Sequence, residues 1–560
     1  MEIKINDKTY EVSAEQTILE AALQNKIYIP TLCFLKETNE IGACRICVVE
    51  VKNARNLVAS CVTKVSEGME IYTDSPKVIA SRKQTLKLIL ENHNYDCDNC
   101  TKNGKCALQK LVKEYNIEFE PKKIESTAEI NNAIIRDNSK CILCNRCVSV
   151  CDKIQGLAVI GRNNRGIDTT IGCEFDKMLS ESLCVKCGQC INVCPTGALM
   201  AKNDIDVVKQ LLSDKNNHVI VAPAPAVRAS LGEEFGLEEN VFGKLVTSLK
   251  MLGFNRVFDV NLTADLTIVE EANELIKRLK SGTKLPLLTS CCPAWVKFIK
   301  NYYPELIPNL STCKSPQQMF GAVMKNYYAL KNNLESKNIK VVTIMPCTAK
   351  KDERLMDSNI DAVLTTRELA DFIKESKIDF VNLKESECDS LFGEGHSVIF
   401  GASGGVMETA LRTAKEVLEN KTSPEIDFVE VRGVKGIKEA TYEINGAKLK
   451  VAVISGLLNA RNVIKQLKNK ECNYDFIEVM SCPGGCINGG GQPLVDDATR
   501  NTTDYRLKRI NILYDIDSKD LKRRAHENET IKAMYDEYFG YPGSERAENL
   551  LHTKHLIDKK

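Results

Sequence analysis

The spacing of apolar and polar residues changes along the chain. The first residues, MEIKINDKTYEV, alternate with the period of two expected for a β-hairpin. The next segment, TILEAALQNK, and the later segment KVIASRKQTLKLILENH carry apolar residues at helical spacing. The pattern predicts a small β-grasp, ferredoxin-like domain over residues 1–75, followed by a helix.

From about residue 209 the pattern becomes strand, loop and helix in alternation. Short apolar runs lie at 218–222, 285–288, 340–345, 397–400, 450–454 and 476–480. This alternation indicates an α/β domain with a largely parallel sheet. Ligands of such sheets bind in loops just past the carboxyl ends of strands. Four runs are followed closely by Pro225, by Cys291 and Cys292, by Cys347 and by Cys482, so we expect one shared site there.

Composition excludes some classes of function. The chain has 560 residues, enough for several domains. With 76 basic and 75 acidic residues its formal charge is +1, which gives no overall attraction to nucleic acid or to an anionic membrane. The N-terminus has no apolar signal core, and no apolar run is long enough to span a bilayer. We therefore expect a cytoplasmic protein.

Cysteine is the unusual component, with 24 residues that occur in tight groups. Disulfides are disfavoured in a reducing cytoplasm, so these spacings indicate metal or redox sites. The strongest signal is a pair of runs with x2-x2-x3 spacing, Cys141 to Cys151 and Cys184 to Cys194. This is the bacterial two-cluster ferredoxin pattern, in which the fourth cysteine of each run ligates the other cluster. It predicts one 4Fe-4S cluster on Cys141, Cys144, Cys147 and Cys194, and a second on Cys184, Cys187, Cys190 and Cys151. The same spacing disfavours paired zinc sites.

Two further groups precede these runs. Cys33, Cys44, Cys47 and Cys61 lack the plant-type ferredoxin spacing, so spacing alone leaves a zinc site open. The group resembles the 2Fe-2S domain of hydrogenases and of respiratory NADH dehydrogenase subunits. His93, Cys97, Cys100 and Cys106 suit either a His-ligated 4Fe-4S cluster or a zinc site with the same one histidine and three cysteines. We favour a 2Fe-2S cluster at the first group because of this resemblance, and a His-ligated 4Fe-4S cluster at the second because it is flanked by redox domains.

These patterns divide the chain into four parts. We expect a 2Fe-2S ferredoxin-like domain at 1–75, a 4Fe-4S domain with one histidine and three cysteine ligands at 76–125, and a ferredoxin domain with two 4Fe-4S clusters at 126–208. A large α/β catalytic domain with a C-terminal extension would occupy 209–560. The fold class is multidomain α/β. A series of clusters would conduct electrons, so the last domain should hold the site at which they are used.

Three motifs mark that site: 289–295 (TSCCPAW), 345–351 (MPCTAKK) and 478–493 (EVMSCPGGCINGGGQP). They supply Cys292, Cys347, Cys482 and Cys486, which suit a further 4Fe-4S cluster. Glycines at 484, 485 and 489–491 allow tight turns and close approach of the backbone to a bulky group. From the residues alone, zinc or a purely structural cluster remains an alternative.

The three motifs, in this order, resemble the active-site motifs of FeFe hydrogenases, and the likeness covers the whole chain, with the layout of the monomeric clostridial type. The resemblance implies that the four cysteines hold the 4Fe-4S part of the H-cluster. Cys486 would also bridge to a two-iron subsite that carries CO, cyanide and an azadithiolate. Cys291 would exchange protons with that subsite, and Lys350 would donate a hydrogen bond to a cyanide. The implied pocket residues are Ala224, Pro225, Ala226, Gln317, Met345, Phe400 and Met480.

A proton route is also implied. Glu271, Glu274 and Arg278 lie at i, i+3 and i+7 on one face of a predicted helix, which by itself would be read as solvated charge. The resemblance implies a path from Cys291 through a water to Glu271, Ser311, Glu274 and Arg278. Ala226 and Ala294 depart from the Ser and Gly of many relatives. Cys173, Cys313, Cys388 and Cys472 are expected to be ordinary thiols, although Cys313 is close to Ser311.

The function expected from this resemblance is the reversible reaction 2 H+ + 2 e− = H2, an oxidoreductase activity. Ferredoxin or a similar carrier would exchange the electrons, and dedicated maturation proteins would supply the two-iron subsite. We expect a monomer or a weak homo-oligomer. The alternative is an H2-sensing or hydrogenase-related non-catalytic iron–sulfur protein, which a complete site with Cys291 and Lys350 disfavours.

Overall fold

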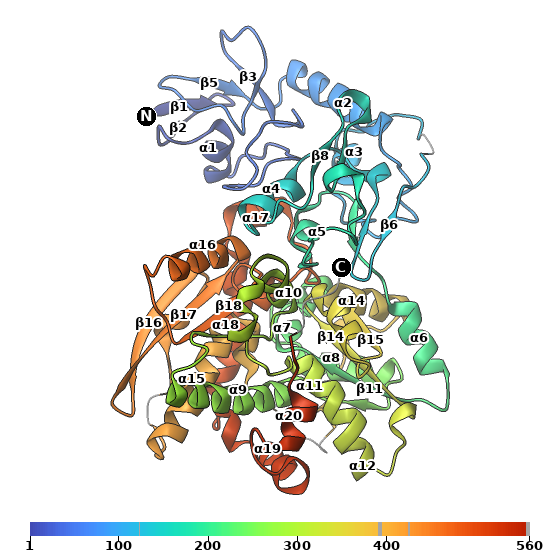
Figure 1. Ribbon diagram of the computed structural model, residues 1–560. Helices are drawn as coiled ribbons and strands as arrows, with labels where there is room; N and C mark the ends of the chain where they lie inside the picture. The colour runs from blue at the N-terminus through green and yellow to red at the C-terminus, as the bar shows by residue number, and fades with distance from the viewer. Residues whose placement is uncertain (122–123, 390–394, 424–425, 556–560) are drawn as a thin grey trace. The chain divides into compact units, whose positions relative to one another are not determined.

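The computed structural model describes residues 1–121, 124–389, 395–423 and 426–555. The chain forms two compact units. The first comprises residues 1–184, 189–200 and 495–504, and the second comprises residues 185–188, 201–494 and 505–560. Figure 1 labels helices and strands of both units. No helix among the described residues is long and apolar enough to cross a membrane.

The first unit begins with a five-stranded sheet in the order β2-β1-β5-β3-β4. The strands are β1 (Glu2–Ile5), β2 (Lys8–Glu11), β3 (Val48–Val51), β4 (Val58–Ala59) and β5 (Glu70–Tyr72). The predicted hairpin is confirmed, because β1 and β2 pair antiparallel. The predicted helix is α1 (Ile18–Gln24), which begins at a capping box formed by Thr17 and Glu20. Its buried residues join the apolar core of the sheet.

The rest of this unit consists of short elements around the cysteine runs. It contains α2 (Pro76–Glu91), α3 (Ala107–Glu114), α4 (Arg146–Lys153), α5 (Gln189–Val193), a β10-β7-β6 sheet (Leu199–Ala201, Ile134–Arg136 and Glu129–Ile130) and the β8-β9 pair (Gly161–Asn163 and Thr170–Gly172). The segment 495–504, with α17 (Asp497–Thr502), also belongs here. The Arg146 guanidinium holds the Asp497 carboxylate with two hydrogen bonds of 2.8 and 2.7 Å. A segment distant in sequence thus completes the cysteine-rich unit.

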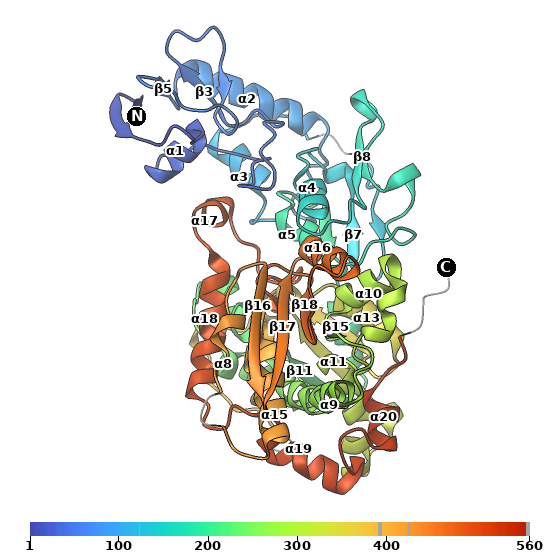
Figure 2. The ribbon, with the colours of Figure 1, turned by 60° about the vertical axis from the view of Figure 1, so that its left-hand side comes forward.

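The second unit contains two four-stranded sheets rather than the single sheet that the sequence suggested. The first is fully parallel, in the order β12-β11-β14-β15 (Arg256–Val257, His218–Pro223, Ile339–Met345 and Ala362–Thr365). The second has the order β13-β18-β17-β16 (Leu287–Leu288, Phe476–Met480, Ala447–Ser455 and Ile437–Ile444), and only the edge strand β16 is antiparallel. Figure 2 shows β16, β17 and β18 side by side.

Five of the six predicted apolar strands are confirmed, and the run at 397–400 is not a strand. It forms the 3-10 helix η11 (Val398–Gly401), whose residues are all buried. A short apolar run does not distinguish a strand from another buried segment. Here the chain turns back on itself after the run, so that Gly405 lies close to Ile399. A Cβ on Gly405 would lie 1.8 Å from the Ile399 carbonyl oxygen, and an extended strand could not make this approach.

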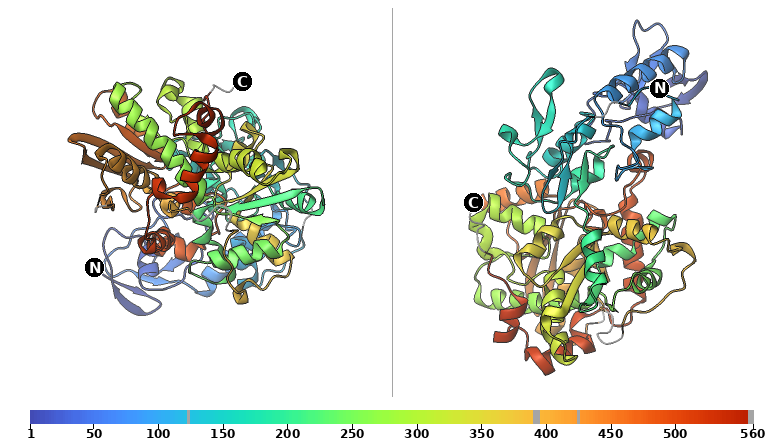
Figure 3. Two further views of the ribbon diagram at one scale, coloured as in Figure 1. Left: turned by 90° about the horizontal axis from the view of Figure 1, so that it is seen from below. Right: turned by 90° about the vertical axis from the view of Figure 1, so that its right-hand side faces the viewer.

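Helices enclose the two sheets of this unit. The helix predicted around Glu271 is α9 (Asn261–Ser281), which packs against α15 (Gly405–Glu419) and α11 (Pro316–Val323). The C-terminal segment contributes α18 (Tyr505–Lys519), α19 (Glu529–Met534) and α20 (Glu545–Leu551). Of these, α19 packs on α9 and α20 on α11; Figure 3 shows the red C-terminal helices beside the green α9.

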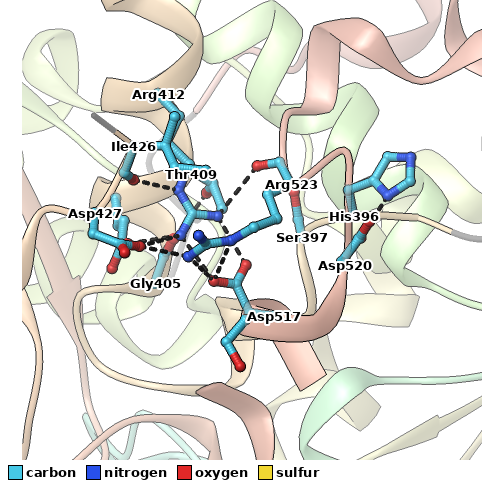
Figure 4. Close-up of polar contacts among 12 residues, drawn as sticks. His396, Ser397, Gly405, Thr409, Arg412, Ile426, Asp427, Asp517, Asp520 and Arg523 are labelled. Carbon is cyan, nitrogen blue, oxygen red and sulfur yellow. Dashed lines mark hydrogen bonds and ion pairs between the residues drawn. The ribbon is translucent and has the colours of Figure 1, made fainter. Parts of the chain in front are cut away.

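Buried ion pairs fix α15 to α18 (Figure 4). Arg412 on α15 donates hydrogen bonds of 2.8 and 2.9 Å to the carboxylate of Asp517 on α18 and one of 2.7 Å to Glu408. The Arg523 guanidinium donates to Asp517 Oδ2 at 2.6 Å, the oxygen that also accepts one of the Arg412 hydrogen bonds. Arg412 is buried, and the carboxylates of Asp517 and Glu408 compensate its charge within the protein interior.

Candidate active site and cluster sites

One cavity lies beyond the carboxyl ends of β11, β13, β14 and β18. Most of its lining residues come from the segments that follow these strands. The loops after these strands carry Pro225, Cys291 and Cys292, Cys347, and Cys482, as the sequence predicted. The cavity contains about 770 Å³ of space between protein atoms, including space open to solvent. It is lined by all thirteen pocket residues expected from the sequence: Ala224, Pro225, Ala226, Cys291, Cys292, Gln317, Met345, Cys347, Lys350, Phe400, Met480, Cys482 and Cys486.

The four predicted ligand thiols of this cavity are suited to a metal cluster. Burial raises the pKa of Cys347 to about 12 and raises the pKa of Cys482 and Cys486 above the usual range, with neighbouring thiols adding to the effect. Such thiols lose their protons readily only when a metal cation replaces them. The backbone approaches closely here, since a Cβ on Gly489 would lie 2.2 Å from the Pro346 carbonyl oxygen. The donor set and the space therefore fit an iron–sulfur group.

Cys291 and Lys350 meet at the wall of the cavity. The Lys350 ammonium donates to the Cys291 carbonyl oxygen at 3.1 Å and to the two Glu353 carboxylate oxygens at 3.1 and 2.9 Å. Burial lowers the pKa of Lys350, but the Glu353 charge and hydrogen bond outweigh it, so the pKa lies above its usual value. Burial raises the pKa of the Cys291 thiol well above its usual range, with Glu271 the largest charge contribution. Lys350 is thus a fixed cation beside a neutral thiol.

Sequence reasoning did not single out Glu353, which orders this wall. Its carboxylate also accepts hydrogen bonds from the Ser315 hydroxyl and the Gln317 amide, each at 3.0 Å. The sequence feature that could have indicated this ion pair is the i, i+3 spacing of Lys350 and Glu353. The lining also includes Val260, Ala264, Pro316 and Gly401, which lie outside the three motifs, and four motif residues to which no pocket role was assigned: Pro293, Pro346, Ser481 and Gly489.

The other residues of the expected proton route lie outside the cavity lining. Glu271, Glu274 and Arg278 are on α9, and Ser311 lies beside this helix. The Ser311 hydroxyl donates to Glu274 Oε2 at 3.0 Å, and Arg278 donates to Glu274 Oε1 at 2.5 Å. Glu271 is 1% exposed, and its Oε2 has no hydrogen-bond partner among the described residues. Burial, with a smaller contribution from Glu274, raises the pKa of Glu271 to about 8. A carboxyl group with this pKa can exchange protons near neutral pH.

The predicted ligands of the first two accessory sites lie in the first unit. The sulfur atoms of Cys47 and Cys61 are 3.3 Å apart, and the Cys44 amide donates to Cys33 Sγ at 3.5 Å. A hydrogen bond from Cys33 lowers the pKa of Cys44 to about 6. At the second site, burial lowers the pKa of His93 to about 4, so its imidazole is neutral. Its buried Nδ1 has no hydrogen-bond partner among the described residues. A nitrogen in this state is available as a metal ligand.

The ferredoxin runs also converge. Cys141, Cys144, Cys147 and Cys194 line one cavity, which brings the fourth cysteine of the second run to the first three of the other. Burial raises the pKa of Cys190 well above its usual range, and the charges of Cys184, Cys147 and Cys151 add to this. Cys187 belongs to the second compact unit, where a Cβ on Gly490 would lie 2.6 Å from its carbonyl oxygen.

Comparison with known proteins identifies the family. Residues 217–490 match the family model of the iron-only hydrogenase large subunit, C-terminal domain, and residues 503–556 match the iron hydrogenase small subunit. The chain is 45% identical over 570 residues to iron hydrogenase 1 from Clostridium pasteurianum, with 99% of each chain covered. The chain belongs to the FeFe hydrogenases. This hydrogenase interconverts protons, electrons and H2.

Further matches describe the remaining parts of the hydrogenase. Residues 1–76 match a 2Fe-2S iron-sulfur cluster binding domain, residues 82–121 the NADH-ubiquinone oxidoreductase-G iron-sulfur binding region, and residues 131–200 the ferredoxin-like domain of NADH-quinone oxidoreductase subunit 3. The chain is also 41% identical to the NADP-reducing hydrogenase subunit HndD from Solidesulfovibrio fructosivorans, over 99% of this chain and 98% of the relative.

A solved structure supports the catalytic fold. An apo FeFe hydrogenase variant from Chlamydomonas reinhardtii superposes with a TM-score of 0.58 at 37% identity, covering 64% of this chain and 100% of that chain. The hydrogenase therefore carries 2Fe-2S and 4Fe-4S clusters and an H-cluster. A sensor or non-catalytic relative is not favoured, since the full-length likeness is to iron hydrogenases.

Proposed function

We propose that Cys292, Cys347, Cys482 and Cys486 hold the H-cluster in the cavity and that Cys291 exchanges its protons. When bound, the H-cluster supplies the iron site at which two protons and two electrons combine to H2. The protein supplies four thiolates, of which those of Cys347 and Cys482 are buried, a fixed cation and a largely apolar wall. The single observation that supports this proposal best is that one cavity is lined by the four thiols, Cys291 and Lys350.

The side chains around the thiols would orient the cofactor and exclude water. Lys350, fixed by Glu353, would offer a charge-assisted hydrogen bond to a cyanide ligand. Met345 and Met480 would pack their soft thioethers against the cofactor, together with Phe400, Gln317 and the 224–226 segment. Ala226, with a methyl group where many relatives carry a hydroxyl, would leave that hydrogen bond to the backbone.

We propose that protons move between Cys291 and the surface through Glu271, Ser311, Glu274 and Arg278. Two hydrogen bonds support this order, because Ser311 donates to Glu274 at 3.0 Å and Arg278 donates to Glu274. Among the charged groups, Glu271 also contributes most to raising the pKa of Cys291. A serine hydroxyl can accept one proton while it donates another, so Ser311 suits the position between two carboxyl groups.

Electrons would pass through the accessory clusters of the predicted domains 1–75, 76–125 and 126–208 to the catalytic domain, 209–560. Cys187 supports a connection to the cavity, because its backbone contacts Gly490 of the third motif and its charge contributes to raising the pKa of Cys482. We propose ferredoxin or a similar carrier as the partner and dedicated maturation proteins as the source of the two-iron subsite. The similarity to a subunit of an NADP-reducing hydrogenase makes the choice of carrier testable. A monomer or weak homo-oligomer and a cytoplasmic location remain predictions.

The test of the proton role is H2 evolution from reduced methyl viologen by anaerobically matured protein, compared with Cys291→Ala. Removing the thiol should lower the rate by about 10²–10⁴-fold, the usual contribution of a positioned proton donor. Infrared bands of bound CO and cyanide should remain in the variant. The matched control is Cys388→Ala, a partly buried thiol outside the cavity, which should keep wild-type activity.

Two outcomes would contradict the proposal. Full activity of Cys291→Ala would exclude this thiol as the proton donor. Loss of the CO and cyanide bands in Cys291→Ala would instead give the thiol a role in holding the cofactor.

A further inference from the structure

Three donor groups meet where the C-terminal segment passes the start of α11. The ligand atoms of Glu274, Cys313 and His552 all lie within 4.8 Å of one another. Cys313 is 1% exposed and His552 is 9% exposed. Cys313 Sγ lies 3.8 Å from Glu274 Oε2 and 4.0 Å from His552 Nδ1. Thiolate, imidazole and carboxylate groups are each common zinc ligands.

The backbone holds two of these groups in register. Cys313 and His552 form an isolated antiparallel β-bridge. The Lys314 amide donates to the Leu551 carbonyl oxygen at 2.8 Å, and the Thr553 amide donates to the Thr312 carbonyl oxygen at 2.7 Å. The thiol and the imidazole are therefore brought together by main-chain pairing.

A second carboxylate orients the imidazole. His552 Nε2 lies 3.1 Å from Glu270 Oε2, and Glu270 also accepts hydrogen bonds from the Tyr535 hydroxyl at 2.6 Å and the Gly543 amide at 2.9 Å. With the Nε2 proton donated to Glu270, Nδ1 keeps its lone pair toward Cys313 and Thr312. A carboxylate that fixes the far nitrogen of a histidine is the usual support of a metal-binding imidazole.

We propose that Glu274, Cys313 and His552 form a binding site for a soft divalent cation such as Zn2+. Ligand atoms around one tetrahedral zinc lie roughly 3.3–3.8 Å apart. The two sulfur distances, 3.8 and 4.0 Å, need to shorten by only a few tenths of an ångström. Zn2+ would displace the thiol proton to solvent and form a zinc–thiolate bond, with water or the Thr312 hydroxyl completing the coordination.

The charges near the site can balance. Arg278 contacts the other oxygen of Glu274 at 2.5 Å, so a bound Zn2+ would have a positive neighbour. The Cys313 thiolate and the carboxylates of Glu274 and Glu270 would offset the three positive charges. Without a cation the thiol is neutral, because burial raises the pKa of Cys313 well above its usual range, with Glu274 and Glu271 adding to this.

A second histidine cluster lacks these features. Glu416, His526 and Glu527 also offer three close ligand atoms. However, the cluster has no thiol and offers only an imidazole and two carboxylates, and its Glu416 forms ion pairs with both Arg524 and His526. We regard it as an ion-pair network, which makes His526 a matched control for His552.

The site would regulate catalysis through the proposed proton route, on which this consequence rests. A cation on Glu274 Oε2 would occupy the oxygen that accepts from Ser311. The route would then be interrupted between Ser311 and Arg278. Zn2+ should therefore inhibit H2 evolution without removing the clusters.

The experiment measures zinc binding and activity separately in the matured holoenzyme. Wild type, Cys313→Ala and His552→Gln are incubated with Zn2+, desalted and assayed for zinc per chain, with Cys472→Ala and His526→Gln as controls. We expect wild type and both controls to retain one additional Zn2+ with a zinc–sulfur distance of about 2.3 Å by X-ray absorption. Both site variants should lose that ion. Glu270→Gln, which alters only the support of the histidine, should weaken zinc affinity by about 10–100-fold.

Activity is then compared with the zinc-free rate of each variant. EDTA should restore the wild-type rate, and Cys313→Ala should resist inhibition. Equal zinc retention by wild type and both site variants would overturn the site. Zinc bound at the site without inhibition would keep the site and overturn its link to the proton route. Iron content verifies that each variant has matured, and Cys313→Ala carries the test if His552→Gln does not fold.

Discussion

At the scale of single residues, burial decides the chemistry of Glu271. Its carboxyl group lies in the protein interior on α9, where the charged form loses its hydration. Its pKa is raised to about 8, above the usual value of about 4.3. Below pH 8 the group is therefore mainly protonated and neutral, and above pH 8 it is mainly ionised.

The pH dependence of H2 evolution should reflect this shift. We expect the wild-type rate to fall as the pH rises through about 8, because Glu271 then loses the proton that it would donate. Glu271→Gln, which has the same shape and no exchangeable acid, should lower the rate by about 10²–10⁴-fold. The assay is H2 evolution across a pH series at a constant driving potential.

The exposed Glu239→Gln serves as the control and should follow the wild-type profile. If Glu271→Gln retains the wild-type rate and the same fall near pH 8, another group carries the protons.

At the scale of elements, the ion pairs of Arg412 determine how firmly α15 is held. The Glu478 carboxylate on β18 accepts hydrogen bonds from the Gly404 and Met407 amides at the start of α15, each at 2.7 Å. In the middle of that helix, Arg412 binds Asp517 on α18. These contacts connect β18, in which the third motif begins, to α15 and α18.

Arg412→Met should destabilise this region by about 1–3 kcal/mol, because the buried carboxylates of Asp517 and Glu408 would each lose one arginine partner and keep only Arg523 and Arg432. Amide hydrogen exchange of α15 and α18 measures the effect. Lys519→Met, which removes an exposed pair with Asp515, should change the same exchange by no more than about 1 kcal/mol. Similar exchange in the two variants would show that the buried network adds little.

At the scale of the whole molecule, the chain crosses between its compact units more than once. Residues 185–188 belong to the second unit although they interrupt a cluster-binding run, and residues 495–504 belong to the first although they follow the third motif. Within the first unit, Arg146 is 2% exposed and its charge is balanced by Asp497. Cluster-bearing and catalytic parts are thus interleaved along the sequence.

Asp497→Asn should loosen the 495–504 segment by about 1–3 kcal/mol, because the Arg146 charge would lose its partner. Since about 1.4 kcal/mol corresponds to a tenfold change, amide exchange of this segment should accelerate by roughly 5–150-fold. Asp496→Asn is the matched control, because asparagine replaces aspartate well as a helix N-cap. Unchanged exchange in Asp497→Asn would show that other contacts hold the segment.

The sequence by itself determined the features that depend on local spacing. Cysteine spacing predicted the cluster chemistry, the helical spacing of TILEAALQNK predicted α1, and five apolar runs predicted strands. Hydrogen bonds of helices and contacts of neighbouring ligands act over a few residues, so a linear pattern records them. The resemblance of three motifs supplied the cofactor and the reaction.

Only the tertiary structure decided what depends on distant contacts. The parallel strands divide between two sheets, and 397–400 turns as a 3-10 helix because Gly405 brings two backbone segments together. The meeting of Cys313 with His552 results from main-chain pairing between segments more than two hundred residues apart. Burial and charge neighbours, which set the pKa of Glu271 and the position of Lys350, arise from packing in three dimensions, and no spacing along the chain encodes them.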